Sequence, residues 1–368
     1  MKNKNYAIQG LRFWAISLII ASHCGFLAQG GVGNNIFFVI SGFFACHPFS
    51  DDDYEKKYFK FSEIIKYYIN RFFRIIPIMW LCLFFATWGL RFFTYNDFST
   101  ENSLLLNMFF IKSRGHLWFL QQEMVFYVIV PFIIILFGLL KCICNKVVKN
   151  PIVINGIVFA FISFSVYITF KFLPRFTSLY LFGNGVLQPL KLWLFLIGMS
   201  FSYLFRLLKL FKDRISDSVK SVLCNLSGIY VFLFLLFTIL SSEHFLTRIN
   251  EARFKGYYIG WEHPIMLAYM ASFVVLALVL MPSDNFVCVV MGNKLFKSIG
   301  DYSFIMYLLH FFFLQYFSGI SVKSRLLSIY VISFCMAYVI HNYIEKPIIA
   351  FIRDKLSDKK IETAKRNE

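Results

Sequence analysis

The chain has 368 residues, of which 58% are hydrophobic and 15% are charged, and its mean hydropathy is +0.65. Soluble domains are about 45–50% apolar and about a quarter charged, so this composition excludes an ordinary soluble globular protein. The formal net charge of +17 does not point to nucleic acid, because Lys and Arg collect in the cytoplasmic loops of membrane proteins. We therefore expect an integral membrane protein.

Apolar segments follow one another along nearly the whole chain. A helix crosses a bilayer with about 20 mostly apolar residues, and about ten segments qualify, the second and ninth being short. We expect an all-α, polytopic transmembrane helical bundle over residues 1–350, followed by a charged cytoplasmic tail over 351–368. The expected spans are Ile8–Leu27, Asn35–Phe49, Ile75–Phe93, Trp118–Leu140, Ile152–Phe172, Leu187–Phe205, Val222–Leu240, Pro264–Met281, Ser303–Phe317 and Leu326–Ile344.

The basic residues indicate how the bundle is oriented. If the N-terminus is inside, 26 of the 37 Lys and Arg residues fall on the cytoplasmic side, whereas the reverse topology inverts this ratio. Because cytoplasmic loops carry the excess of Lys and Arg, the sequence predicts that both termini are cytoplasmic. We expect the protein to lie in the inner, cytoplasmic membrane of a bacterium.

Two polar residues, Arg12 and His23, lie inside the first apolar segment. Ionisable side chains are costly within a bilayer and usually mark functional sites there. Eleven residues separate the two, which on a helix is roughly 16 Å of rise and about 20° of rotation. Both side chains are therefore expected on one helix face, with Arg12 near the membrane entrance and His23 deep. A long substrate on this face would have an anionic part at the arginine and a reactive end at the histidine.

A second set of charged residues lies at the cytoplasmic start of the third segment. Arg71 and Arg74 are three residues apart, so they share a helix face, and guanidinium groups bind phosphate through paired hydrogen bonds. Lys66 precedes them and is a further candidate for the same site. Glu345, near the cytoplasmic end of the last segment, is a candidate partner for either arginine.

Other polar residues interrupt apolar segments. Ser41 and Gly42 lie in the short second span, where the glycine permits close approach of a backbone or a ligand. Glu123 lies in the fourth span and should face the bundle interior or pair with a cation, and Trp118 precedes it by five residues. His310 lies in the ninth span and is a candidate for proton transfer, for contact with the acceptor or for a structural role.

The remaining histidines do not suggest a metal centre. His47 and His116 are expected outside the deep part of the bundle. His341 and Glu345 have the i, i+4 spacing of a helical ligand pair, but two candidate ligands do not make a zinc site, and no HExxH motif is present. We expect no bound metal.

The polar residues belong to an ordered set of motifs. The chain resembles the membrane acyltransferase-3 family over about residues 6–350. The matching motifs are GLRFWAISLIIASH at 10–23, FFVISGF at 37–43, RFFR at 71–74, HLWFLQQEMVFY at 116–127 and EKP at 345–347. The resemblance implies ten or so spans, an acyl-CoA donor (usually acetyl-CoA) and O-acylation of a carbohydrate.

The resemblance suggests which residues take part in acyl transfer. A hydroxyl acceptor needs a base, and His23 is the natural candidate because histidine exchanges protons near neutral pH; the alternative is a histidine that only packs. Arg12 either binds phosphates of the donor or orients the histidine, or else is an anchor that reaches the membrane surface. Ser41 either donates to the thioester carbonyl or bonds its own helix. Glu123 either takes part in acid–base chemistry or pairs with an arginine.

The donor is expected to dock from the cytoplasm. CoA carries a pyrophosphate and a ribose phosphate, which suit Arg71 and Arg74 with Lys66 nearby; the alternative is ordinary contact with lipid headgroups. Trp118 is expected to line the same cavity or to mark the membrane interface. Direct transfer is expected, and an acyl-enzyme intermediate on Ser41 is the alternative that the sequence leaves open.

We therefore expect an O-acyltransferase that moves an acyl group, most simply acetyl, to a surface polysaccharide or its lipid-linked glycan precursor. A transporter or flippase for a lipid-linked saccharide is the main alternative, since about ten spans and intramembrane charges fit that class too. An acyltransferase for a lipid or a small molecule is a third. Only the acyltransferases need an acyl-CoA donor.

Overall fold

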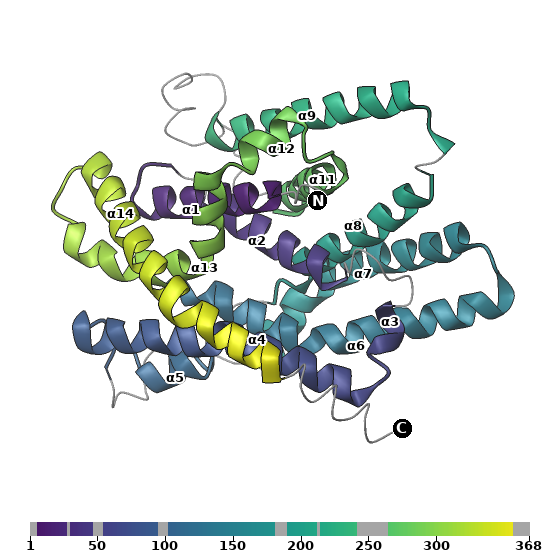
Figure 1. Cartoon of the computed structure of the whole chain (residues 1–368). Coiled ribbons are helices and arrows are strands. Elements are labelled where there is room, and N and C mark those ends of the chain that lie inside the picture. Colours follow the sequence, from purple (N-terminus) through teal and green to yellow (C-terminus); the bar gives the residue numbers. More distant parts are fainter. Residues whose placement is uncertain are drawn as a thin grey trace.

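The structure is a computed structural model that describes residues 6–27, 30–46, 54–94, 102–180, 190–211, 214–240 and 264–355. Two predictions from the sequence, the position of His47 and the charged tail beyond residue 355, lie outside these ranges. The described residues contain helices and one isolated bridge between Thr94 and Ser103, with no strand among them. The predicted all-α class is therefore confirmed for the described part of the chain (Figure 1).

Sixteen helical elements are present among the described residues. Their bounds are α1 Ala7–His23, α2 Gly30–Ala45, α3 Tyr54–Lys57, α4 Phe61–Phe84, η1 Phe85–Gly89, α5 Leu104–Met108, α6 Leu117–Val147, α7 Pro151–Tyr180, α8 Leu192–Phe211, α9 Asp217–Leu240, α11 Pro264–Leu280, α12 Phe286–Met291, α13 Lys294–Phe313, η3 Leu314–Phe317, α14 Val322–Ile340 and η4 His341–Glu345. In Figure 1, α9 lies along the upper side, α4 and α6 lie along the lower side, and α1, α2 and α13 lie between them.

Each predicted span falls on one of these helices, and six helical segments are long and apolar enough to cross a bilayer. These are Phe61–Gly89, Leu117–Val147, Pro151–Leu173, Leu192–Phe211, Asp217–Leu240 and Val322–Lys355. The apolar helices α2 and α11 are shorter, with 16 and 17 residues. The number of ten spans stays a prediction.

The helix that carries the third predicted span begins earlier in the chain than the span. The span is predicted from Ile75, and α4 begins at Phe61. The sequence between them is charged, so hydropathy alone does not reveal that it is helical. As a result Arg71 and Arg74 lie inside a long helix, on the shared face that their spacing predicts, and their side chains have fixed directions.

Small residues bring α1 and α13 into close contact at the centre of the bundle. A Cβ atom at Gly300 of α13 would lie 2.0 Å from the carbonyl oxygen of Gln9 of α1. A Cβ atom at Gly10 would lie 2.0 Å from the carbonyl oxygen of Met291 at the end of α12. Membrane helices pack closely where small residues let their backbones approach. This contact places the polar side chains of α1 directly beside α13.

A similar contact joins α2 to α8. A Cβ atom at Gly42 would lie 2.0 Å from the carbonyl oxygen of Phe195, and one at Gly198 would lie 2.3 Å from the carbonyl oxygen of Val39. The sequence predicts close approach of a backbone or a ligand at Gly42, and the structure shows a backbone. Because α8 covers this side of α2, the adjacent Ser41 points to the opposite side, into the bundle.

The short helix α3 is joined to the ends of α6 and α8 by a buried carboxylate. Glu55 is 2% exposed and its side chain accepts hydrogen bonds from Arg206 Nη1 at 2.6 Å, Lys141 Nζ at 3.0 Å and Tyr203 Oη at 2.5 Å. Burial raises the pKa of the Glu55 carboxyl, but the two cations and the tyrosine outweigh this and hold the pKa below its usual value. Arg206 also donates to the carbonyl of Cys46, just after α2, so the network fixes this end of the bundle.

Candidate active site

A cavity of about 380 Å³ lies between six elements of the bundle. Its volume is within the range of about 300–1,000 Å³ that is typical of small-molecule sites. It is lined by Gln9 and Arg12 of α1, Phe37, Ile40, Ser41 and Phe44 of α2, Arg71, Arg74 and Ile75 of α4, Phe119, Leu120, Glu123 and Tyr127 of α6, Gly300, Asp301, Ser303, Phe304 and Tyr307 of α13, and Glu345 of η4.

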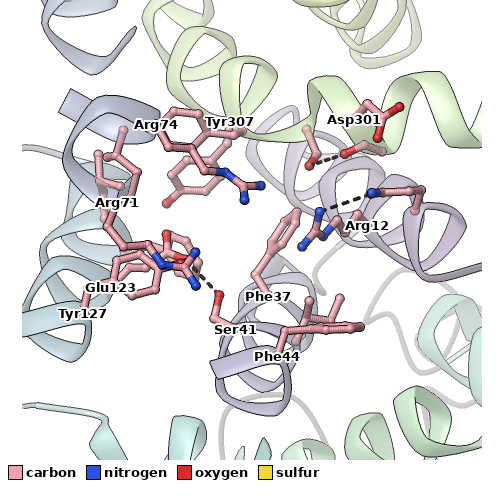
Figure 2. Close-up of a pocket in the computed structure, with 18 of the residues that line it drawn as sticks. Arg12, Phe37, Ser41, Phe44, Arg71, Arg74, Glu123, Tyr127, Asp301 and Tyr307 are labelled. Carbon is pink, nitrogen blue, oxygen red and sulfur yellow. Dashed lines mark hydrogen bonds between the residues drawn. The ribbon is translucent and has the colours of Figure 1, made fainter. Parts of the chain in front are cut away.

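Three guanidinium groups face this cavity, from two helices far apart in sequence (Figure 2). Arg71 and Arg74 come from the face of α4 that their spacing predicts, and Arg12 comes from α1. Arg12 Nη1 donates to Gln9 Oε1 at 3.2 Å, and the Arg71 guanidinium lies 4.6 Å from the centroid of the Tyr127 ring. Neither contact neutralises a positive charge.

Within the described residues, the carboxylates that line the cavity bond to groups other than the three arginines. Glu123 Oε1 accepts hydrogen bonds from Ser41 Oγ at 2.9 Å and from Tyr127 Oη at 2.7 Å. Asp301 pairs with Lys297 at 3.1 Å, and Glu345 bonds to His341 Nδ1 at 2.6 Å. Within the described ranges, no carboxylate oxygen lies within 4.0 Å of the guanidinium nitrogens of Arg12, Arg71 or Arg74.

The cavity therefore holds three positive charges that the protein does not pair directly. Unpaired charges in a bundle are costly, and guanidinium groups bind phosphate and carboxylate groups with paired hydrogen bonds. This arrangement suits an anion with several phosphates. Glu345 lines the same cavity as the arginines but bonds to His341, so the predicted pairing with Arg71 or Arg74 is not present.

A pair of histidines lies further along α1 and α13. Nδ1 of His23 and Nε2 of His310 are 2.8 Å apart, and their rings are nearly coplanar, with an interplanar angle of 3°. Nδ1 of His310 also lies 2.8 Å from the carbonyl oxygen of Tyr307. A carbonyl only accepts, so Nδ1 of His310 carries a hydrogen, and in the neutral ring its Nε2 accepts. His23 therefore donates from Nδ1, which leaves a lone pair on its Nε2.

The expectation that Arg12 and His23 share one helix face is correct. Both side chains face α13, as eleven residues of helix predict: Arg12 reaches the cavity beside Gly300 and Asp301, and His23 reaches His310. His23 is the last residue of α1, and its side chain is exposed. It is His310 that is completely buried.

His116 lies beside this pair, contrary to the expectation that it stays outside the deep part of the bundle. It is 2% exposed, its Nε2 lies 3.1 Å from the carbonyl oxygen of Leu308, and its ring centroid is 5.3 Å from that of His310. Its own carbonyl accepts a hydrogen bond from Tyr307 Oη at 2.5 Å. The reason is local: His116 caps the start of α6 where that helix meets α13.

Tyr307 connects the two parts of the site. It lines the cavity on one side and contacts His116 and His310 on the other, with ring centroids 5.3 and 5.6 Å apart. His23 does not line the cavity. The anion-binding chamber and the histidine pair are therefore neighbours along α13, separated by the ring of Tyr307.

Two residues predicted for donor binding are placed elsewhere. Lys66 pairs with Glu63 at 2.6 Å on the surface of α4 and does not line the cavity. Trp118 does not line the cavity; it makes a cation–π contact with Lys191, whose Nζ lies 4.4 Å from the ring centroid. Lys66 lies on another face of α4 from the arginines, because five residues of helix rotate a side chain by about 140° from Arg71.

Sequence reasoning missed Gln9 and Tyr127 as members of the site. Both had a usable signal, since Gln9 lies one helical turn before Arg12 and Tyr127 one turn after Glu123. Within the described residues, no group of three or more His, Cys, Asp or Glu side chains is placed to hold a metal ion.

An apolar bundle of long helices that encloses a chamber of arginines next to a histidine pair defines a membrane protein with a polar internal site. Comparison with known proteins gives its family: the profile of the acyltransferase-3 family, described as an acyltransferase domain, matches residues 5–344. The chain belongs to this family, and its apolar helices make it an integral membrane protein.

Curated relatives agree with this assignment at low identity. The chain is 23% identical to the O-acetyltransferase OatA of Staphylococcus aureus (strain NCTC 8325 / PS 47), over 93% of this chain and 56% of that protein. It is 26% identical to the protein named Putative membrane-bound transacylase BcsY of Komagataeibacter xylinus, over 34% of this chain and 32% of that protein. The chain thus spans little more than half the length of the OatA relatives. No solved structure matches it.

Proposed function

We propose that the protein is an O-acetyltransferase that moves an acetyl group from cytoplasmic acetyl-CoA to a hydroxyl group of a cell-envelope glycan. The observation that carries this proposal is the pair of neighbouring sites: a chamber with three guanidinium groups not paired to carboxylates, and a histidine whose Nε2 is free to accept a proton. The family and the name of the OatA relatives support the reaction type.

The chamber is proposed to bind the phosphates of CoA. The pyrophosphate and the ribose phosphate together match several guanidinium groups, and each bidentate contact adds both charge and geometry. Arg71 and Arg74 lie on α4, whose first half is charged, and the excess of basic residues supports a cytoplasmic location for this end of the bundle, where CoA is available. Arg12 would hold the donor on the side that leads toward His23.

His23 is proposed as the base. Its Nε2 takes the proton from the glycan hydroxyl as the oxygen attacks the thioester carbonyl carbon, so that a C–O bond forms. The C–S bond then breaks, and the proton on His23 passes to the CoA thiolate, which leaves as the thiol. His310 does not touch substrate in this scheme and acts as a positioning residue that holds the hydrogen of His23 on Nδ1.

Ser41 and Glu123 are proposed to act at the chamber. The Ser41 hydroxyl donates to Glu123, so its oxygen lone pairs remain available toward the cavity while the carboxylate fixes its position. In direct transfer, Ser41 and Glu123 shape the donor site. In the alternative route, Glu123 accepts the hydroxyl proton and Ser41 carries the acetyl group as an ester, which mass spectrometry of the protein after incubation with acetyl-CoA alone would detect.

The donor arm must pass Tyr307 to reach His23. Arg12 and His23 are separated by roughly 16 Å along α1, and Tyr307 with its hydrogen bond to the His116 carbonyl lies between the two sites. We propose that this side chain moves when the thioester end of the donor enters. Such side-chain gating is a usual way to keep water from a reactive centre.

The test is equilibrium binding of acetyl-CoA to the purified protein in detergent, comparing wild type with the double variant Arg71→Ala/Arg74→Ala. Saturable binding that the double variant weakens at least tenfold is expected, since each charge-assisted contact contributes about 1.5–3 kcal/mol. Lys66→Ala removes a positive charge from the same helix outside the cavity and should leave affinity unchanged. A folded wild-type protein that does not bind acetyl-CoA would contradict the proposal and favour the transporter alternative.

A further inference from the structure

A second hollow, of about 510 Å³, lies between α1, α14 and the end of α9. We call it the lateral groove. It is lined by Trp14, Ser17, Leu18, Ala21, Phe26 and Leu27 of α1 and the turn after it, by Ile239 of α9, and by Lys323, Leu326, Leu327 and Tyr330 of α14. Nearly all of these side chains are hydrocarbon or aromatic.

The polar groups on its walls are already paired, with one exception. Ser17 Oγ and Tyr330 Oη bond to each other at 3.0 Å, and Trp14 Nε1 donates to Thr238 Oγ1 at 2.9 Å. The exception is Lys323 at the rim, which is exposed and whose ammonium group contacts no carboxylate within 4.0 Å in the described residues. The groove thus offers an apolar wall and a single positive charge.

The lateral groove and the histidine pair share one end of the bundle. Gln9 lies beside Gly300 and His23 beside His310, so α1 and α13 run parallel. The chain returns from α13 into α14 through a short connection, and α14 therefore runs antiparallel to α1. Its first turn, with Lys323, consequently lies at the end of α1 where His23 is exposed.

The groove occupies the opposite face of α1 from His23. Trp14, Leu18 and Ala21 repeat at helical spacing and are rotated about half a turn from the face of Arg12 and His23. From Trp14 to Ala21 the wall extends roughly 10 Å along the helix. A molecule held there can reach His23 only by passing over the end of α1.

We infer that the lateral groove holds the hydrocarbon tail of the lipid phosphate to which the acceptor glycan is attached, with the phosphate at Lys323 and the glycan leading over the end of α1 to His23. The inference rests on the proposed function, because it specifies the acceptor for that reaction. An apolar wall beside an ammonium group matches a tail followed by a phosphate, because a cation near a membrane surface attracts an anionic headgroup. The exposure of His23 at this end leaves it open to the glycan.

Photo-crosslinking tests the groove without requiring catalysis. The full chain in lipid nanodiscs is illuminated with a diazirine-bearing polyprenyl phosphate, and labelled peptides are mapped by mass spectrometry. Labelling is expected on peptides of α1 around Ala21 and of α14 around Leu326, and unlabelled polyprenyl phosphate should compete with it, whereas excess phosphatidylglycerol should not.

Three variants probe the two parts of the groove. Ala21→Phe and Leu327→Trp place an aromatic ring in the apolar part, and Lys323→Glu reverses the charge at the rim; Lys323→Glu is expected to lower labelling roughly tenfold. Because Leu327 and Lys323 are exposed, their variants should fold even if Ala21→Phe does not. Ala160→Trp on the exposed face of α7 and Lys146→Glu at the end of α6 are the matched controls and should label as wild type.

Labelling spread evenly over lipid-facing helices, or removed equally by phosphatidylglycerol, would overturn the inference and show bulk lipid in the groove. Labelling that none of the three groove variants changes would also overturn it. The acetyl-CoA binding test is independent of this readout, so failure of the groove and failure of the proposed function can be told apart.

Discussion

Nδ1 of His23 donates a hydrogen bond to Nε2 of His310 across the contact of α1 with α13, at a distance of 2.8 Å. The direction of this bond follows from the second bond of His310, in which Nδ1–H donates to the carbonyl of Tyr307. A backbone carbonyl on α13 thus determines which nitrogen of His23 faces outward with a lone pair. These two hydrogen bonds set the tautomer of His23 at the end of α1.

Replacing His310 should therefore lower turnover without changing donor affinity. In His310→Ala, His23 loses the partner that fixes its tautomer, and we expect kcat to fall roughly 100-fold with an unchanged Kd for acetyl-CoA. His310→Gln retains an oxygen near the position of Nε2 and should recover part of the loss. Equal activity of the alanine and glutamine variants would show that His310 only fills space.

Gly115→Ala should disturb the packing of Phe311 against His23 and His116. Gly115 has a φ of +58°, and a Cβ atom there would lie 2.6 Å from the Phe311 ring, which packs against both His23 and His116. We expect the free energy of unfolding to fall by about 1–2 kcal/mol, because a residue with a Cβ atom is strained in this backbone conformation. We also expect reduced transfer activity. Gly156→Ala on α7, where a Cβ atom would meet nothing within 4 Å, is the control. A Gly115→Ala protein with wild-type Tm and activity would contradict the packing described here.

Gly42→Ala should force α2 away from α8. The added Cβ atom would lie 2.0 Å from the backbone oxygen of Phe195, and overpacking of this kind costs about 1–3 kcal/mol. Because Ser41 is the adjacent residue, its hydrogen bond to Glu123 should lengthen and donor affinity should fall as well. Thermal unfolding in detergent and acetyl-CoA binding measure the two effects. Gly319→Ala, with open space around its Cβ atom, should change neither.

The carboxyl group of Glu55 should make stability depend on pH. Its pKa in the folded protein is below the usual value, so its contribution is fully present above the unfolded pKa, about 4.3, and is lost as the pH falls through the folded value. Glu55→Gln leaves Arg206 and Lys141 without their buried partner, and we expect it to cost about 3 kcal/mol near neutral pH.

The control for the Glu55 substitution is an ion pair on the surface of the neighbouring helix α4. Glu63 bonds to Lys66 at 2.6 Å with both side chains partly exposed, and exposed pairs contribute about 0–1 kcal/mol. Glu63→Gln should therefore shift Tm very little, and its acid unfolding curve should follow wild type. If Glu55→Gln unfolds with the same pH dependence as wild type below pH 5, the carboxylate is not the titrating group.

The sequence predicts this fold well where its signals are local. The rotation of Arg12 relative to His23, and that of Arg71 relative to Arg74, follow from helix geometry alone, and both pairs lie as expected. Trp118 and Lys66 do not line the cavity, because proximity along the chain does not determine which helix face meets it. That face depends on where α4 and α6 pack, and their packing is determined by contacts between residues far apart in the sequence.

The end of α1 at His23 and the buried position of His116 could not be predicted for a related reason. Hydropathy extends the first apolar segment to Leu27, but α1 ends at His23, because the chain must turn to let α2 pack back. His116 lies before an apolar segment and so looks peripheral, yet α13 covers it. Only the contact between the start of α6 and α13 shows that three histidines meet.

In the proposed reaction, acetyl groups pass from the arginine chamber to a glycan at the far end of α1. The most direct measurement is transfer from radiolabelled acetyl-CoA, supplied only to the side of sealed proteoliposomes that carries Arg71 and Arg74, to a glycan acceptor extracted from the native envelope and enclosed on the other side. We expect ester-linked label on the enclosed glycan with wild-type protein and at least 100-fold less with His23→Ala. Full transfer by His23→Ala, or label that appears only when donor and acceptor share one side, would contradict it.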